Sequence, residues 1–218
     1  LRHVNLPESD GKFQLEGLLA DFEGSTTYFE ASDGDGTFKI RPSSYTAGGK
    51  PLISMSAEIK GGQMTAGPAD FTLSMPVGDV IVEVSLKETE LIGDAFIGPD
   101  GVSYESGTLS GYALLSDIFA GLNSYAKSEC SCLGVSGDIF TKGSKSWNGN
   151  CVEGASAKCP DNSCAVIAGA SLLDGEICTL LPSMLGNSAD IDLDSDGTAF
   201  EGLSVGLEWR GVPATIAQ

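Results

Sequence analysis

Apolar and polar side chains alternate along short stretches in the first half of the chain. In the clearest stretch, residues 80–87, valines and a leucine occupy one face of an extended strand, and the other face is mostly polar. This period of two is typical of an antiparallel strand with one packed and one wet face. After Leu86 the alternation slips, because Glu88 and Glu90 fall where apolar residues stood, and the slip predicts a bulge or bend. Further strands are predicted at 12–16, 26–29, 37–40, 52–59, 70–75, 95–97 and 102–109.

The apolar period becomes helical from Ser110 onward. Apolar side chains recur at helical spacing from Tyr112 to Tyr125, Ser110 can cap the amino end, and Lys127 suits the carboxyl end. A second helix is predicted at about 174–185, with Pro182 near its end. These helices and the cysteine-rich stretch between them predict a helical and disulfide-rich insertion, residues 110–190.

The alternating pattern returns near the end of the chain. Leu203, Val205, Leu207 and Trp209 alternate with less apolar residues, and 212–216 prolongs the extended run. We expect this strand to rejoin the sheet of the first half. The predicted fold is therefore mainly β with an α insertion: an antiparallel β-sandwich or sheet with a disulfide-stapled helical and loop insertion. We expect one domain, residues 1–218, with a β-sheet core at 1–109, the insertion, and an acidic loop and returning strand at 191–218.

The charge of the chain narrows the classes of partner. Twelve Lys and Arg residues oppose 30 Asp and Glu residues, which gives a formal net charge of −18. A field of that sign repels nucleic acid and anionic lipid, whereas cations and cationic partners are favoured. No apolar run reaches the roughly 18 residues of a membrane-spanning helix, so no transmembrane segment is predicted. The chain starts at Leu1 without methionine, and we expect a processed mature chain or an excised domain.

All six cysteines lie in the second half of the chain. An even count in one dense segment, outside any zinc-binding spacing, predicts three disulfides and an oxidising compartment, hence an extracellular or outer cell-surface location. The pairing stays open. The six residues are Cys130, Cys132, Cys151, Cys159, Cys164 and Cys178.

Alternating aspartates form the sharpest local motif. Asp192, Asp194, Asp196 and Gly197 match the first half of a helix-loop-helix calcium loop. Leu203 occupies the closing position, and Glu201 lies two residues out of register. We therefore predict a Ca²⁺ loop with non-standard closure, or alternatively a solvated acidic turn that leads into a strand. The candidate ligands are Asp190, Asp192, Asp194, Asp196 and Glu201.

No set of residues in the sequence forms a coherent catalytic constellation. The run 202–206 fits the G-x-S-x-G pattern of hydrolases, but it lies inside a strand pattern, and the one histidine, His3, lies far upstream. Two tryptophans can serve a binding module that stacks on sugars. Trp209 is predicted to lie in the core, and Trp147, in a glycine-rich loop, is predicted to be exposed.

Several of these stretches together resemble a bacterial family. They are 80–97, Gly107-Thr108-Leu109-Ser110-Gly111, 192–197 and 202–209 with 212–216. This pattern is similar to that of uncharacterised secreted or lipid-anchored surface proteins of myxobacteria and related bacteria. The resemblance implies an outer-surface bacterial location and brings no established catalytic residues. It also implies a longer amino-terminal part, so an upstream segment is expected to have been removed.

Three functions follow from the sequence, in this order. The first is a non-enzymatic extracellular or cell-surface protein with a structural or adhesive role, self-assembling and stabilised by Ca²⁺, whose partners are itself or other surface proteins. The second is a glycan- or ligand-binding module that uses Trp147. The third is a carboxylate-dependent hydrolase.

Overall fold

The computed structural model describes residues 1–23, 37–77, 80–99, 101–134, 136–143, 146–152, 166–167, 170–171, 175–195, 197 and 201–216. Strands make up 54 % of the described residues, which also include two α-helices. The prediction of a mainly β fold with an antiparallel sheet is confirmed. The predicted strand at 26–29 lies outside the described residues.

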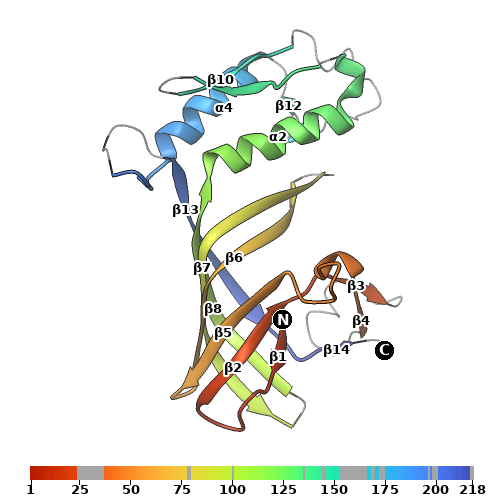
Figure 1. The fold of residues 1–218 in the computed structure, drawn as a ribbon, viewed down its shortest axis with the longest axis vertical. Coiled ribbons are helices and arrows are strands. Elements are labelled where there is room, and N and C mark those ends of the chain that lie inside the picture. Colours follow the sequence, from red (N-terminus) through yellow and green to blue (C-terminus); the bar gives the residue numbers. More distant parts are fainter. Residues whose placement is uncertain are drawn as a thin grey trace. The chain divides into compact units, whose positions relative to one another are not determined.

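Seven strands form the main sheet (Figure 1). Their order across the sheet is β1 (Arg2–Val4), β2 (Gly11–Gly17), β5 (Ile53–Lys60), β6 (Gln63–Val77), β7 (Val80–Gly98), β8 (Gly101–Leu114) and β13 (Gly202–Gly211). The last strand lies beside β8. The prediction that the carboxyl-terminal strand rejoins the sheet of the first half is therefore confirmed.

The remaining elements are short strands and helices. A three-stranded sheet consists of β3 (Ala20–Glu23), β4 (Thr37–Ile40) and β14 (Thr215–Ile216), with β14 parallel to β4. The two-stranded pairs are β9 (Phe140–Lys142) with β10 (Trp147–Gly149) and β11 (Val166–Ile167) with β12 (Ala170–Ser171). The helices are α2 (Leu115–Glu129), α4 (Gly175–Ser188) and two 3₁₀ turns, η1 (Pro42–Ser44) and η2 (Ser131–Leu133).

The chain divides into two compact units. The sheet unit comprises Leu1–Phe71, Glu88–Gly111 and Gly206–Gln218, and the helical unit comprises Thr72–Lys87 and Tyr112–Val205. The helical unit thus contains most of the predicted insertion at 110–190, together with strand residues of β6 and β7. Strands β6, β7, β8 and β13 each contribute residues to both units.

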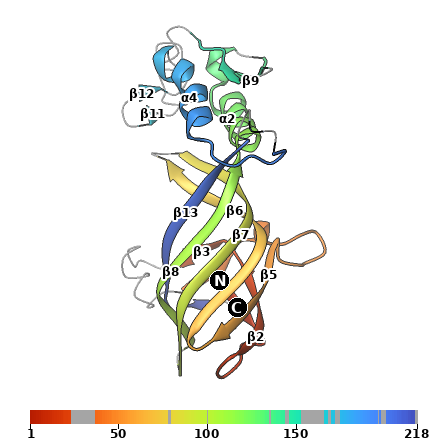
Figure 2. The same ribbon diagram turned by 90° about the vertical axis from the view of Figure 1, so that its left-hand side faces the viewer.

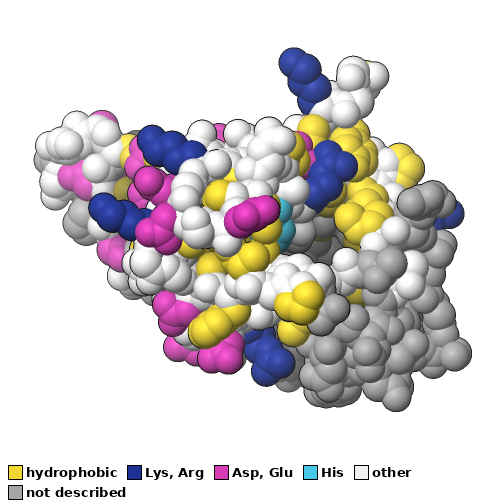
Figure 3. Space-filling model, turned by 90° about the horizontal axis from the view of Figure 1, so that it is seen from below, with side chains coloured by type: hydrophobic (Ala, Val, Ile, Leu, Met, Phe, Trp, Pro, Cys, Tyr) yellow, Lys and Arg dark blue, Asp and Glu magenta, His cyan; other side chains and the backbone are white. Residues whose placement is uncertain are grey.

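Three aromatic side chains pack together in the sheet unit. His3 of β1 shares a hydrogen bond of 2.7 Å between Nε2 and the hydroxyl of Tyr104 of β8, and the Tyr104 ring lies 4.9 Å from that of Trp209. Strands β1 and β8 are far apart in the strand order, so this contact requires the twisted sheet to curl (Figure 2). The histidine is half-buried beside hydrophobic side chains (Figure 3).

Burial changes the ionisation of both hydrogen-bonded side chains. It lowers the pKa of His3 to about 4 and raises the pKa of Tyr104 to about 12.

The break in alternation after Leu86 coincides with a backbone irregularity. Glu88 has a positive φ of 49°, and Thr89 is fully buried while its neighbours are exposed. Gly67, on the paired strand β6, also has a positive φ, and a side chain there would strike the carbonyl oxygen of Thr89. These features agree with the predicted bulge. The stretch 95–97, predicted as a separate strand, is the continuation of β7 beyond it.

The first helix starts later than the sequence predicts. Strand β8 continues to Leu114, so Ser110 lies in the sheet and does not cap the helix. The reason is that the alternation continues to Ala113, which is buried, and pairing in the sheet satisfies its backbone. Leu115 begins α2, and its N–H donates to the carbonyl oxygen of Glu201 at 2.9 Å. The second helix also extends further than predicted, so that Pro182 lies inside it.

The helical unit has its own apolar core. Phe119 of α2 stacks on Trp147 of β10, with ring centroids 4.5 Å apart, and lies 5.3 Å from Phe140 of β9. Trp147 lies in β10 and not in a loop as predicted, and its indole is half-buried against Phe119. Cys151, just after β10, forms a disulfide with Cys178 of α4, with Cα atoms 5.6 Å apart.

Candidate functional site

The acidic loop, residues 192–201, is closed by the two residues that flank it. Ile191 and Gly202 form an antiparallel bridge, in which each N–H donates to the carbonyl oxygen of the other residue at 3.1 Å. In this antiparallel register, Asp192, one residue after Ile191, lies opposite Glu201, one residue before Gly202. Glu201 therefore lies across from the first aspartate of the loop, and Leu203, at the closing position of the helix-loop-helix motif, lies beyond the bridge.

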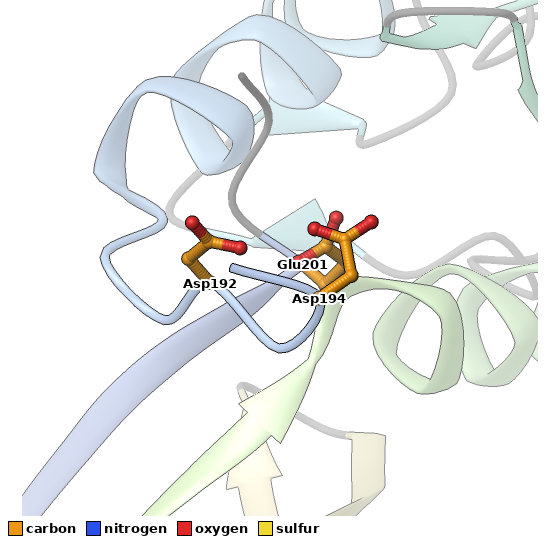
Figure 4. A group of neighbouring side chains, drawn as sticks. All are labelled: Asp192, Asp194 and Glu201. Atoms are coloured by element: carbon orange, nitrogen blue, oxygen red, sulfur yellow. The ribbon is translucent and has the colours of Figure 1, made fainter. Parts of the chain in front are cut away.

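Three carboxylates meet inside this loop. Asp192, Asp194 and Glu201 each offer a carboxylate oxygen, and these oxygens lie within 4.8 Å of one another (Figure 4). Asp194 is exposed, whereas Asp192 and Glu201 are half-buried. Like charges at this separation repel, and a cation between them removes that repulsion. Carboxylate oxygens are the ligands that hard cations prefer. This triad can therefore hold a metal ion.

Backbone hydrogen bonds fix two of these carboxylates. Asp192 accepts one hydrogen bond on each oxygen, from the N–H of Ser195 at 2.7 Å and from that of Gly197 at 2.9 Å. Ser195 and Gly197 both have a positive φ, which lets the loop curl back over Asp192. Glu201 accepts from the N–H of Leu193 at 3.1 Å. Each carboxylate oxygen has two acceptor positions, so these bonds orient the carboxylates and leave capacity for a cation.

The other two predicted ligands are placed differently. Asp190 accepts hydrogen bonds from the N–H of Ser204 at 2.7 Å and from its hydroxyl, and it is not a member of the triad. The Ser204 hydroxyl and N–H lower the pKa of Asp190. Asp190 therefore joins the start of the loop to β13. Asp196 lies outside the described residues. The sequence does not reveal the role of Ser204, because that partnership depends on the bridge.

The cysteines outside the Cys151–Cys178 pair are only partly described. Cys130 and Cys132 are disulfide-bonded, and Cys159 and Cys164 lie outside the described residues. The disulfide-stapled character of the insertion is thus confirmed, and the predicted count of three bridges stays a prediction.

Each unit also carries a surface depression. One, of about 570 Å³, lies in the sheet unit along β7, β8 and β13 and includes Asp94, Glu105, Glu208 and Arg210. Trp209 borders it: its indole N–H is buried and its ring packs with Tyr104, but the residue as a whole is half-buried and not fully in the core as predicted. The other, of about 490 Å³, lies in the helical unit and includes Trp147.

Among the described residues, no helix combines the length and hydropathy needed to cross a lipid bilayer. No protein-family model, curated protein or solved structure matches this chain.

Proposed function

We propose that this chain is a non-enzymatic extracellular or outer cell-surface protein with a structural or adhesive role, and that its acidic loop binds Ca²⁺. The observation that carries the proposal is the grouping of the Asp192, Asp194 and Glu201 carboxylates. Ca²⁺ takes six to eight oxygen ligands in flexible geometry, and exposed loops leave positions for backbone oxygens and water. Mg²⁺ requires a stricter octahedral arrangement, so Ca²⁺ is the better match.

The wider architecture supports a location outside the cell. The Cys151–Cys178 disulfide and the bonded Cys130 and Cys132 suit an oxidising compartment. The resemblance to myxobacterial surface proteins supports the same outer-surface location. Strand β13 ends the main sheet, and no other strand of the described chain pairs along its outer side. Such an edge suits association with a second copy.

Thermal unfolding with and without Ca²⁺ tests the metal site. Extracellular calcium modules bind with dissociation constants of about 0.1 to 1 mM, so about 10 mM Ca²⁺ is 10 to 100 times that constant. This ratio stabilises the folded state by about 1.4 to 2.7 kcal/mol, and raises the Tm of a chain of this length by about 3 to 10 °C. We expect Asp194→Asn and Glu201→Gln to lose this shift.

Glu8→Gln is the matched control, because it removes one negative charge from an exposed position in the sheet unit. It should keep the full Ca²⁺ shift. An equal shift in Asp194→Asn would show that the effect is general charge screening and would contradict the metal site, and an equal shift with Mg²⁺ would contradict the preference for Ca²⁺. Light scattering in Ca²⁺ and in chelator then tests assembly separately: a mass that falls in chelator supports calcium-linked self-association, and an unchanged monomer contradicts it.

A further inference from the structure

A depression in the helical unit lies along α2, β9 and β10. Its volume is about 490 Å³, and it is open to solvent. Its lining combines an indole, hydroxyl groups and two ammonium groups, from Trp147, Ser116, Ser124, Thr141, Lys127 and Lys142. Ligand sites typically pair apolar or aromatic surface with a few polar groups that fix orientation. This lining has the same composition, with one indole beside several hydroxyl and ammonium groups.

The walls of the depression are held in place by paired contacts. Asn123 of α2 donates to the carbonyl oxygen of Phe140 and accepts from its N–H, each at 2.8 Å. Lys127 of α2 pairs with Asp138, just before β9, at 2.6 Å. The helix and the strand are therefore fixed relative to each other at two points. A preformed site loses little freedom when a ligand binds, and this improves affinity.

Trp147 supplies a flat apolar surface. Phe119, which is fully buried, stacks on one side of the indole, with ring centroids 4.5 Å apart. The indole is half-buried and lines the depression, so part of its surface remains accessible there. Aromatic rings present an apolar surface against which the C–H face of a pyranose ring can pack.

The charge in the depression opposes that of the chain. The net charge of the protein is −18, with only 12 Lys and Arg residues, yet this lining carries Lys127 and Lys142 against the single carboxylate of Asp138. An ammonium group has three N–H donors, so Lys127 can bind a second anion while it keeps Asp138. The favoured ligand is therefore anionic, in contrast to the cationic partners that the total charge favours.

We propose that this depression binds a sugar that carries an anionic group, with the sugar ring against Trp147 and the acidic group between Lys127 and Lys142. The hydroxyls of Ser124 and Thr141 line the depression and can donate to ring hydroxyls, and Thr141 also accepts from the side-chain amide of Asn150 at 3.5 Å. This site is separate from the acidic loop, and the inference does not depend on Ca²⁺.

A glycan array tests the inference first. It should carry carboxylated sugars with uronic or sialic acids, sulfated sugars, and the neutral counterpart of each. We expect signals on the anionic members only, and the array reports whether carboxylate or sulfate is preferred. Chelator in the buffer excludes bridging by metal ions, and about 0.15 M salt screens charges beyond about 8 Å, so the total charge of the chain matters little.

Titration with trigalacturonic acid and its methyl ester, followed by tryptophan fluorescence, then isolates the charge. We expect the acid to bind and the ester to bind at least about tenfold more weakly, since a charge-assisted hydrogen bond is lost. Lys142→Gln and Lys127→Gln should each weaken binding of the acid about tenfold. Lys60→Gln, on the exposed surface of the sheet unit, should leave it unchanged. Lys142→Gln leaves the Lys127–Asp138 pair in place and Lys127→Gln removes it, and circular dichroism checks that each variant keeps the fold.

Three results would overturn the inference. They are an array without anionic hits, equal binding of the acid and its ester, and unchanged affinity in the Lys127→Gln, Lys142→Gln double variant. If the array selects a sulfated sugar, that sugar and its desulfated form replace the galacturonate pair, with the same variants.

Discussion

Gly107→Ala in β8 should destabilise the protein, because an added methyl group has no room. An ideal Cβ at this position would lie 2.5 Å from Cε2 of Trp209, 2.6 Å from its Nε1 and 2.7 Å from the carbonyl oxygen of Ile92. The Ile92 oxygen belongs to the backbone of β7 and cannot move without disturbing the sheet. Overpacking of this kind costs about 1 to 3 kcal/mol. Displacement of Trp209 from Tyr104 adds lost contacts, so we expect about 2 to 3 kcal/mol.

Urea unfolding followed by far-UV circular dichroism measures this loss as a lower midpoint. Gly206→Ala is the matched control, because Gly206 lies in the neighbouring strand β13 and a Cβ there meets nothing within 4 Å. Alanine in a strand interior is more stable than glycine by about 0.5 to 1 kcal/mol, so the control should be neutral or slightly stabilised. Adding Trp209→Val should relieve the part of the Gly107→Ala defect that comes from the indole, whereas the clash with the Ile92 oxygen remains. Equal midpoints for the two alanine variants would refute the close packing of Trp209 over β8.

Three further perturbations test other contacts. Asn123→Ala should lower the free energy of unfolding by about 2 to 4 kcal/mol in urea, because the buried N–H and carbonyl groups of Phe140 lose their partners; a loss below about 1 kcal/mol would contradict this. Replacing Cys151 and Cys178 together by alanine should remove about 3.5 kcal/mol, since the bridge closes a loop of 27 residues, and an unchanged midpoint in non-reducing urea would contradict it. His3 has a folded pKa of about 4 and an ordinary value of 6.5. The unfolded chain therefore takes up a proton in this range while the folded chain does not, so acidification from pH 6.5 to 4 should destabilise the wild type more than His3→Gln. Parallel pH profiles would exclude His3 as the cause.

The sheet could be predicted from the sequence because alternation records which face of a strand is buried. Strand β4 has the predicted bounds, and the slip after Leu86 coincides with the positive φ of Glu88. The start of α2 could not be predicted, because Ser110 is a good N-cap by type but lies in a strand that the sheet extends to Leu114. Local preference was overridden there by pairing with neighbouring strands.

The candidate site was predictable in its residue types and not in its closure. Alternating aspartates identify Asp192 and Asp194, but the register of Glu201 depends on the Ile191–Gly202 bridge, which is a long-range contact. The same holds for Trp147: its place in a glycine-rich stretch indicates exposure, whereas its contact with Phe119 depends on the path of α2. A sequence pattern reports side-chain chemistry, and pairing decides which of those side chains meet.

Helix α2 connects the acidic loop to the depression, yet the two proposed sites should act independently. The Leu115 N–H donates to the carbonyl oxygen of Glu201, so a cation held by Glu201 would steady the first turn of this helix. Lys127 lies twelve residues further on, about 18 Å along the axis at about 1.5 Å per residue. That distance exceeds the screening length of about 8 Å at physiological salt, so the charge of the cation barely reaches the lysine. Calcium should therefore change thermal stability and leave the affinity for an anionic sugar unchanged, and either proposal can fail without the other.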